Sequence, residues 1–208
     1  SEMYIRDRKQ TLLTKACEEL SKIRQKNAAA LTQKLKAALI NLNFLTVEFD
    51  IAVRPGQTIT AKGYDDVEFL ISTNPGESLK PLSQVASGGE LSRIMLAIKT
   101  VLAGRDEIDT LIFDEIDTGI SGRTAWKVAE QLSVLSGAHQ VICITHLPQI
   151  AAMADVHFAI EKSSTDDMTI TDIRKVADEE SLAELARLLG SDALTEAALS
   201  LSLIHISE

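Results

Sequence analysis

Two adjacent carboxylates, Asp114 and Glu115, are the side chains in this sequence best placed to do chemistry. They follow the short apolar run 110–113, which predicts a strand buried on both faces. Open α/β sheets bind ligands at the carboxyl ends of their strands, and successive side chains on a strand point in opposite directions. We therefore expect Asp114 to hold Mg²⁺ and Glu115 to act on water as a general base. The alternative is a pair of turn or helix-capping acids without chemistry.

A histidine occupies a similar position farther along the chain. His146 follows a second apolar run, 140–145, which also predicts a buried strand. A lone histidine after a strand is more often structural than catalytic. If the two strands are parallel neighbours, however, their carboxyl ends share one edge of the sheet, and His146 then lies beside the acid pair. That arrangement favours a proton-handling role.

The sequence Ser87-Gly88-Gly89-Glu90 opens a predicted helix. One interpretation is a capping box, in which Ser87 caps the helix and Glu90 reaches back to the cap. The other is an anion site, because two glycines leave backbone N–H groups uncovered at the positive end of the helix dipole, where a phosphate can approach closely. The motif alone does not decide between the two.

The hydrophobic period predicts the elements that must position these residues. Residues 4–42 form one long predicted helix of about 58 Å, since apolar residues recur every three or four positions without Pro or Gly. From Phe44 to Val53 the period is two, which predicts a strand that ends in a turn at Pro55-Gly56. The remaining predictions are strands at 67–71, 110–113 and 140–145, helices at 89–103, 122–135 and 148–154, a hairpin of 156–160 with 168–173, and two short C-terminal helices. Strands that alternate with helices after residue 105 indicate a parallel α/β sheet.

The long helix leaves two interpretations open. Its narrow apolar stripe and highly charged flanks favour the end of a coiled coil that runs into the domain. The alternative is an amphipathic helix packed along its whole length on the domain. The apolar positions are Leu12, Ala16, Leu20, Ile23, Leu31, Leu35, Leu39 and Leu42.

Composition excludes some classes of protein. The 208 residues are 45% hydrophobic and 25% charged, as is usual for a globular protein. No apolar run approaches the roughly 18 residues that span a bilayer, and the first residues lack the pattern of a signal peptide, so we expect a cytoplasmic protein. Cys17 and Cys143 stand alone and are expected to be reduced and structural. The net charge of −9 argues against a surface broadly adapted to nucleic acid, so any DNA contact must be local or made by other parts of a longer protein.

In combination and in order, three segments resemble the signature, Walker B and switch-histidine motifs of ABC-type ATPases. They are 87–93 (SGGELSR), 113–122 (FDEIDTGISG) and 145–151 (THLPQIA). Together with Asn74-Pro75-Gly76-Glu77, they resemble the C-terminal part of the RecN family of bacterial DNA repair proteins, which are relatives of the SMC proteins. The likeness extends from about residue 40 to about residue 195.

The resemblance implies a fold class and a set of partners. The fold is α/β: the C-terminal lobe of an ABC/SMC-type P-loop NTPase head with a mostly parallel sheet, at 43–200, preceded by the C-terminal arm of a coiled coil at 1–42. An N-terminal lobe of the same protein brings the Walker A loop, since this sequence contains no G-x-x-x-x-G-K-[ST]. A second head forms a homodimer with the first, and DNA, at ends or single strands, is the target of ATP-dependent double-strand break repair. The expected location is the cytoplasm, at the nucleoid and not in a membrane.

The resemblance also assigns roles in binding and hydrolysing ATP. Asp114 holds Mg²⁺, while Glu115 and His146 are the catalytic residues for the nucleotide of their own head. Four residues bind ATP in trans, on the partner head: Ser87, Gly88, Gly89 and Glu90. Asp117 matches the D-loop aspartate that bridges two heads.

Two alternatives remain at this point. The chain is a head of another SMC-like chromosome-maintenance ATPase, or a catalytically silent module that uses an ATPase-like fold for dimerisation. The presence of both Glu115 and His146 argues against the second. Residues 201–208 depart from the family pattern and are expected to be a disordered tail or one not native to the protein.

Overall fold

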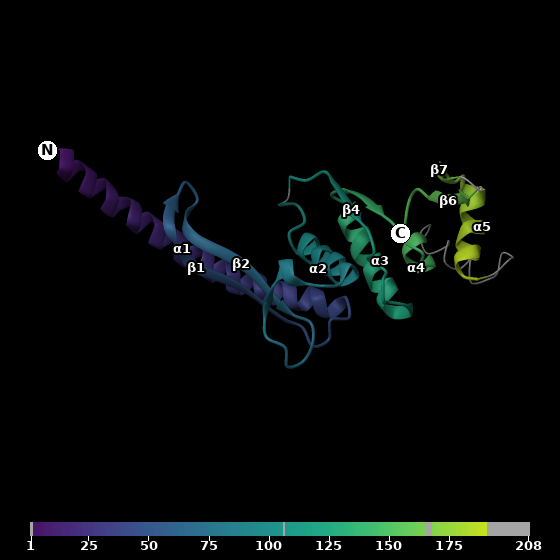
Figure 1. The fold of residues 1–208 in the computed structure, drawn as a ribbon, viewed down its shortest axis with the longest axis horizontal. Helices are drawn as coiled ribbons and strands as arrows, with labels where there is room; N and C mark the ends of the chain where they lie inside the picture. The colour runs from purple at the N-terminus through teal and green to yellow at the C-terminus, as the bar shows by residue number, and fades with distance from the viewer. Residues whose placement is uncertain (1, 106, 165–167, 191–208) are drawn as a thin grey trace. The chain divides into compact units, whose positions relative to one another are not determined.

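The computed structural model describes residues 2–105, 107–164 and 168–190 (Figure 1). The chain forms two compact units, Ser1–Ser87 and Gly88–Glu208. The first unit thus contains more than the arm expected at residues 1–42, because the helix shares its core with the strands that follow it. The predicted tail and the second C-terminal helix lie outside the described residues. None of the described helices is both long and apolar enough to cross a membrane.

The first unit is a long helix packed against a long hairpin. Helix α1 (Glu2–Asn41) confirms the predicted helix, and strands β1 (Glu48–Thr60) and β2 (Gly63–Ser72) lie along its second half (Figure 1). The strand β3 (Lys80–Pro81) pairs with β2, which completes an antiparallel sheet of order β1-β2-β3, and the 3₁₀ helix η1 (Leu82–Gln84) follows.

The apolar positions of α1 fall on two faces. Cys17, Leu35 and Leu39 are buried, whereas Leu12 and Ile23 are exposed. Residues 3–16 are exposed throughout. The helix is therefore packed on its own unit from Cys17 onward, and its first four turns present apolar side chains to solvent.

The prediction of a turn at Pro55-Gly56 is wrong. Strand β1 continues to Thr60, with an irregularity between Pro55 and Thr60, and the chain reverses just before Gly63. Among the described strands β1 pairs with β2 alone, and a proline is tolerated on such an edge strand because its missing N–H has no partner to lose. A Cβ at Gly56 would lie 2.6 Å from the carbonyl oxygen of Tyr64, so the glycine serves close packing here instead of a turn.

The second unit follows the predicted order of helices and strands. It contains α2 (Gly88–Val101), β4 (Thr110–Phe113), α3 (Gly122–Ser136), β5 (Gln140–Cys143), α4 (Pro148–Ala151), β6 (Phe158–Ser164), β7 (Thr169–Lys175) and α5 (Asp178–Leu188). Gly104 adopts a φ of +77° just beyond α2, as expected of a glycine that follows a helix. Strands β6 and β7 form the predicted antiparallel hairpin.

The sheet differs from the mostly parallel one that was predicted. Among the described strands only β4 and β5 pair in parallel, and both other sheets are antiparallel. The prediction that β4 is buried on both faces is also wrong for the described part of the chain. Leu111 and Phe113 are buried, but Ile112 is 68% exposed and Ile142, its partner on β5, is 45% exposed, because the described elements cover one face only.

Candidate functional site

Strands β4 and β5 bring the acid pair and the histidine to one edge. The two strands pair in register from Thr110 with Gln140 to Phe113 with Cys143. The N–H of Ile144 continues the ladder by donating to the carbonyl of Phe113 at 3.0 Å. The segments after β4 and β5 therefore leave the sheet at the same end. This confirms the prediction that the two strands are parallel neighbours whose carboxyl ends share one edge.

The chain turns tightly directly after β4. The Oδ1 atom of Asp114 accepts the backbone N–H of Glu115 at 2.8 Å, and the carbonyl of Glu115 accepts the N–H of Thr118 at 3.0 Å. Glu115 itself adopts a φ of +56°, which side-chain-bearing residues rarely adopt. Both acids are exposed. Backbone strain of this kind clusters at functional sites, where the surrounding contacts hold it in place.

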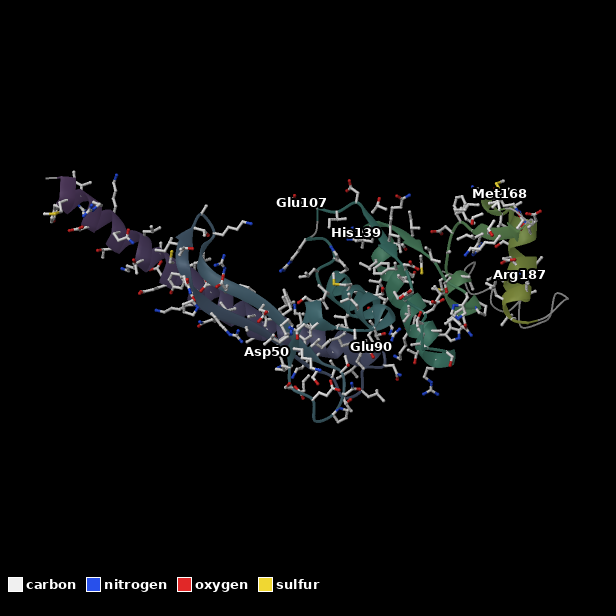
Figure 2. All side chains as sticks on the ribbon, in the orientation of Figure 1. Asp50, Glu90, Glu107, His139, Met168 and Arg187 are labelled. Carbon is white, nitrogen blue, oxygen red and sulfur yellow. The ribbon has the colours of Figure 1, made fainter. Side chains whose placement is uncertain are left out.

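The start of α2 packs closely on this turn. A Cβ at Gly88 would overlap the carboxylate of Glu115, and one at Gly89 would lie 2.9 Å from both the carbonyl oxygen of Glu115 and the Cβ of Thr118. At Gly89, where the neighbours include backbone oxygens, only glycine fits such an approach, whereas at Gly88 the flexible Glu115 side chain could move aside. This packing role of the two glycines is one that the sequence did not reveal. Glu90, half-buried in the first turn of α2, is labelled in Figure 2, whereas Ser87 ends the first unit.

Two further residues of α2 hold the turn, and the sequence reasoning did not single them out. The hydroxyl of Ser92 donates to the carbonyl of Asp114 at 2.7 Å. The buried guanidinium of Arg93 donates to the carbonyls of Ile116 and Thr118 at 3.1 and 2.9 Å. The available signal was the position of Arg93, which lies four residues after Gly89 on the buried face of the helix.

Burial lowers the pKa of the Arg93 guanidinium, and the negative charges of Glu90 and Asp117 oppose that effect. The cation is thus stabilised in the core by carbonyl oxygens and by nearby carboxylates. Helix α2 and the turn after β4 are consequently joined by charge-assisted hydrogen bonds as well as by close packing.

Asp117 has partners other than those the resemblance implied. It is only 4% exposed, and its Oδ2 atom accepts the Thr145 hydroxyl at 2.6 Å and the His146 backbone N–H at 2.8 Å. The Nδ1 atom of His146 lies 2.9 Å from the same oxygen. These contacts all lie within its own unit, and the bridge to a second head that the resemblance implies stays a prediction.

The edge is electrically negative. Burial, followed by the charges of Asp117 and Asp114, raises the pKa of the Cys143 thiol to about 12. That thiol therefore stays protonated at neutral pH, and the structural role expected for it stays a prediction. A hard cation with oxygen ligands suits the exposed carboxylate of Asp114 in such a field. Since no group of three acid, histidine or cysteine side chains gathers among the described residues, Asp114 would supply one ligand of several.

Known proteins are similar to this chain in sequence and in fold. No family model matches it. It is 44% identical over 181 residues to the DNA repair protein RecN of Halalkalibacterium halodurans. The aligned region covers 85% of this chain and 32% of that protein. It is 47% identical over 189 residues to RecN of Treponema pallidum, covering 88% and 33%. The RecN of Bacillus subtilis is 50% identical over 138 residues, covering 66% and 24%.

The chain therefore spans about a third of the length of these curated relatives, or less. Among solved structures, the Smc head domain with a coiled coil and joint from Pyrococcus yayanosii matches with a TM-score of 0.54 and 19% identity, over 79% of this chain and 30% of that one. The Smc head domain with an extended coiled coil from Pyrococcus furiosus, bound to the C-terminal domain of ScpA, matches with a TM-score of 0.52 and 19% identity, over 83% and 41%. Over most of its length this chain belongs to the family of the bacterial DNA repair protein RecN, of which it matches about a third, and its fold is similar to part of an Smc head domain with a long N-terminal helix.

Proposed function

We propose that this chain supplies the hydrolytic half of an ATPase head in a DNA repair protein. One observation carries the proposal: the parallel pairing of β4 with β5 places Asp114, Glu115 and His146 at a single edge, against the glycines that begin α2. Carboxylates, an imidazole and the amides of a helix N-terminus are groups that can serve phosphoanhydride hydrolysis. The relationship to RecN supports DNA repair as the setting.

Each residue of the edge has a separate task in this proposal. Asp114 supplies an oxygen ligand to Mg²⁺, which would neutralise phosphate charge when bound. Glu115 takes the proton of the attacking water, and its exposed carboxylate is accessible for that purpose. His146, also exposed, holds or moves a proton near the terminal phosphate. The first turn of α2, with Gly88, Gly89 and Glu90, together with Ser87 before it, meets the phosphate bound by a second head.

A second lobe of the same protein completes the head. The sequence carries no phosphate-binding loop of the G-x-x-x-x-G-K-[ST] type. Parallel strands are normally covered on both faces, yet Ile112, Ile142 and Ile144 are exposed on one face of the β4–β5 pair. A groove of about 290 Å³ also runs between α2 and β4, lined mostly by apolar side chains such as Leu91, Met95 and Phe113. We assign the N-terminal lobe, with its Walker A loop, to this face and groove.

The longer-range partners follow from the same proposal. The exposed apolar side chains on the first turns of α1, including Ile5 and Leu12, suit a second coiled-coil helix. Closure of two heads on ATP, and their release after hydrolysis, would move these arms and alter contacts with DNA ends or single strands at the nucleoid.

The test uses the longer protein, which includes the Walker A lobe. Glu115→Gln keeps the shape of the side chain but removes the proton acceptor, so hydrolysis should slow by ~10²–10⁴-fold. ATP should still bind, and heads should accumulate as an ATP-bound dimer in sedimentation experiments. Ser87→Arg should bind ATP without forming that dimer, because the arginine blocks the contact with the partner's phosphate.

The matched control is Glu107→Gln, the same chemical change on an exposed acid shortly before β4 (labelled in Figure 2). It should hydrolyse ATP and dimerise like the unmodified protein. If Glu115→Gln and Ser87→Arg also behave like the unmodified protein, the edge is not a hydrolytic site and the silent dimerisation module is the better interpretation.

A further inference from the structure

Asp117 connects the two segments that leave the sheet at the candidate site. It belongs to the turn after β4, and its three contacts all lie on Thr145 and His146, directly after β5. All three contacts converge on one oxygen, Oδ2, of a carboxylate that is almost completely buried. Charge-assisted hydrogen bonds to a buried carboxylate are among the strongest in proteins.

The contact between Asp117 and the imidazole determines which ring nitrogen carries the proton. The Nδ1 atom of His146 lies 2.9 Å from this oxygen, and an ionised carboxylate at that distance repels a nitrogen lone pair, which favours the proton on Nδ1. A neutral imidazole with its proton on Nδ1 keeps a lone pair on Nε2. The side chain of His146 is 72% exposed, and among the described residues its Nε2 atom has no hydrogen-bond partner.

The surroundings of Asp117 keep the carboxylate in place. Arg93 donates to the carbonyls of Ile116 and Thr118, which lie on either side of Asp117, and the charges of Arg93 and Asp117 attract each other. Ile116, the residue before Asp117, is completely buried. The carbonyls of the residues on both sides of the acceptor are thus held, whereas the imidazole it contacts remains accessible.

We propose that Asp117 is a positioning residue, which holds His146 with its proton on Nδ1 and presents the unprotonated Nε2 to a ligand. The identity of that ligand as a nucleotide phosphate and its water rests on the proposed function. Asp117 acts through His146 and does not itself contact the nucleotide. A merely structural Asp117 would tie the two segments together through Thr145 and the backbone without setting the tautomer.

The test is a measurement of the His146 tautomer by ¹⁵N NMR on this chain, at a mildly alkaline pH where imidazoles are neutral. The resonance is identified by its loss in His146→Gln. We expect the Nδ1–H form in the unmodified chain, and a change to the Nε2–H form in Asp117→Ala. Thr145→Val, which removes a different donor to the same oxygen, is the matched control and should keep the Nδ1–H form.

An Nε2–H tautomer in the unmodified chain would overturn the proposal without any variant having to fold. So would an unchanged tautomer in a folded Asp117→Ala chain, with folding checked by backbone amide spectra. In the longer protein, Asp117→Ala should lower kcat by about 10²-fold, the cost of a misplaced reacting group, with little change in KM for ATP. If the tautomer changes as expected but no ATP hydrolysis is found even without substitution, the proposed function fails and the positioning role of Asp117 stands.

Discussion

Glu115 combines the chemistry of the site with its backbone strain. Its φ of +56° is held by the turn that ends at Thr118 and by the close approach of Gly88 and Gly89. A left-handed conformation costs a side-chain-bearing residue on the order of 1 kcal/mol. The turn orients the carboxylate at the end of β4. At this residue the strained backbone lowers the stability of the fold while it positions a functional group.

Glu115→Gly should therefore give a more stable chain than Glu115→Ala, by on the order of 1 kcal/mol, because glycine adopts positive φ without strain. The free energy of unfolding from urea titration measures the difference. A control pair, Glu130→Gly and Glu130→Ala, lies at an exposed position of helix α3, and there alanine should be more stable than glycine. Equal stabilities of the two Glu115 variants would show that the turn is not strained.

A partly buried ion pair connects helix α1 to the β1–β2 hairpin. Arg24 donates to Asp65 at 2.8 Å and to the carbonyl of Lys62 at 2.6 Å. Gly63, at a φ of +90°, lets the hairpin approach Leu20 and Arg24 closely. The Asp65 side chain is 1% exposed, so its charge depends on this pairing. The tip of the hairpin is therefore attached to the middle of the helix, roughly four to five turns before the helix ends at Asn41.

The pairing makes stability depend on pH. Hydrogen bonds from Arg24, and secondly from Ser21, lower the pKa of Asp65 below its ordinary value of 3.8. A lowered pKa in the folded state adds stability above the ordinary value, and that contribution is lost as pH falls through the folded value. Asp65→Asn should thus lower the melting temperature at neutral pH, and the difference from the unmodified chain should shrink below pH 3.8.

Thermal unfolding followed by circular dichroism over that pH range measures this difference. Asp50→Asn is the control, because Asp50 is an exposed acid on β1 of the same hairpin (Figure 2). The control should change the melting temperature little at any pH. A difference for Asp65→Asn that stays constant from neutral to acid pH would mean that the charge of Asp65 contributes nothing.

At the scale of the whole molecule, the exposed face of the β4–β5 pair is the feature that most needs a partner. A two-stranded parallel sheet with Ile112 and Ile142 in solvent is not an arrangement that proteins normally leave open. The curated relatives are about three times as long as the part this chain matches. They thus have enough additional chain to cover that face.

We expect the chain to show no ATP turnover alone and to gain it when mixed with a separately produced N-terminal lobe. Ile112→Glu should weaken that association by about tenfold or more, equivalent to about 1.4 kcal/mol, since a charge would be buried in the joint sheet. Val134→Glu, on an exposed apolar residue of α3, should leave the association unchanged. Turnover by the isolated chain that Glu115→Gln abolishes would contradict the need for a second lobe.

The sequence by itself determined what depends on local pattern. The hydrophobic period located α1, α2, α3 and the core of every described strand except β3, because helices and strands place their apolar side chains at fixed and different intervals. The positions of Asp114, Glu115 and His146 at strand ends were predictable for the same reason. A family resemblance then supplied the order of the motifs.

Tertiary structure alone decided which contacts those elements make. The local sequence at Pro55 predicts the end of a strand, but β1 continues through it because this strand lies at the edge of its sheet. Arg93 and Asp117 look like surface charges, and they are buried because carbonyls and hydroxyls from distant segments satisfy them. Whether Ile112 is buried depends on what covers its face of the sheet, and hydrophobicity alone does not specify that. These outcomes depend on groups that are far apart in sequence, and no local pattern records where such groups meet.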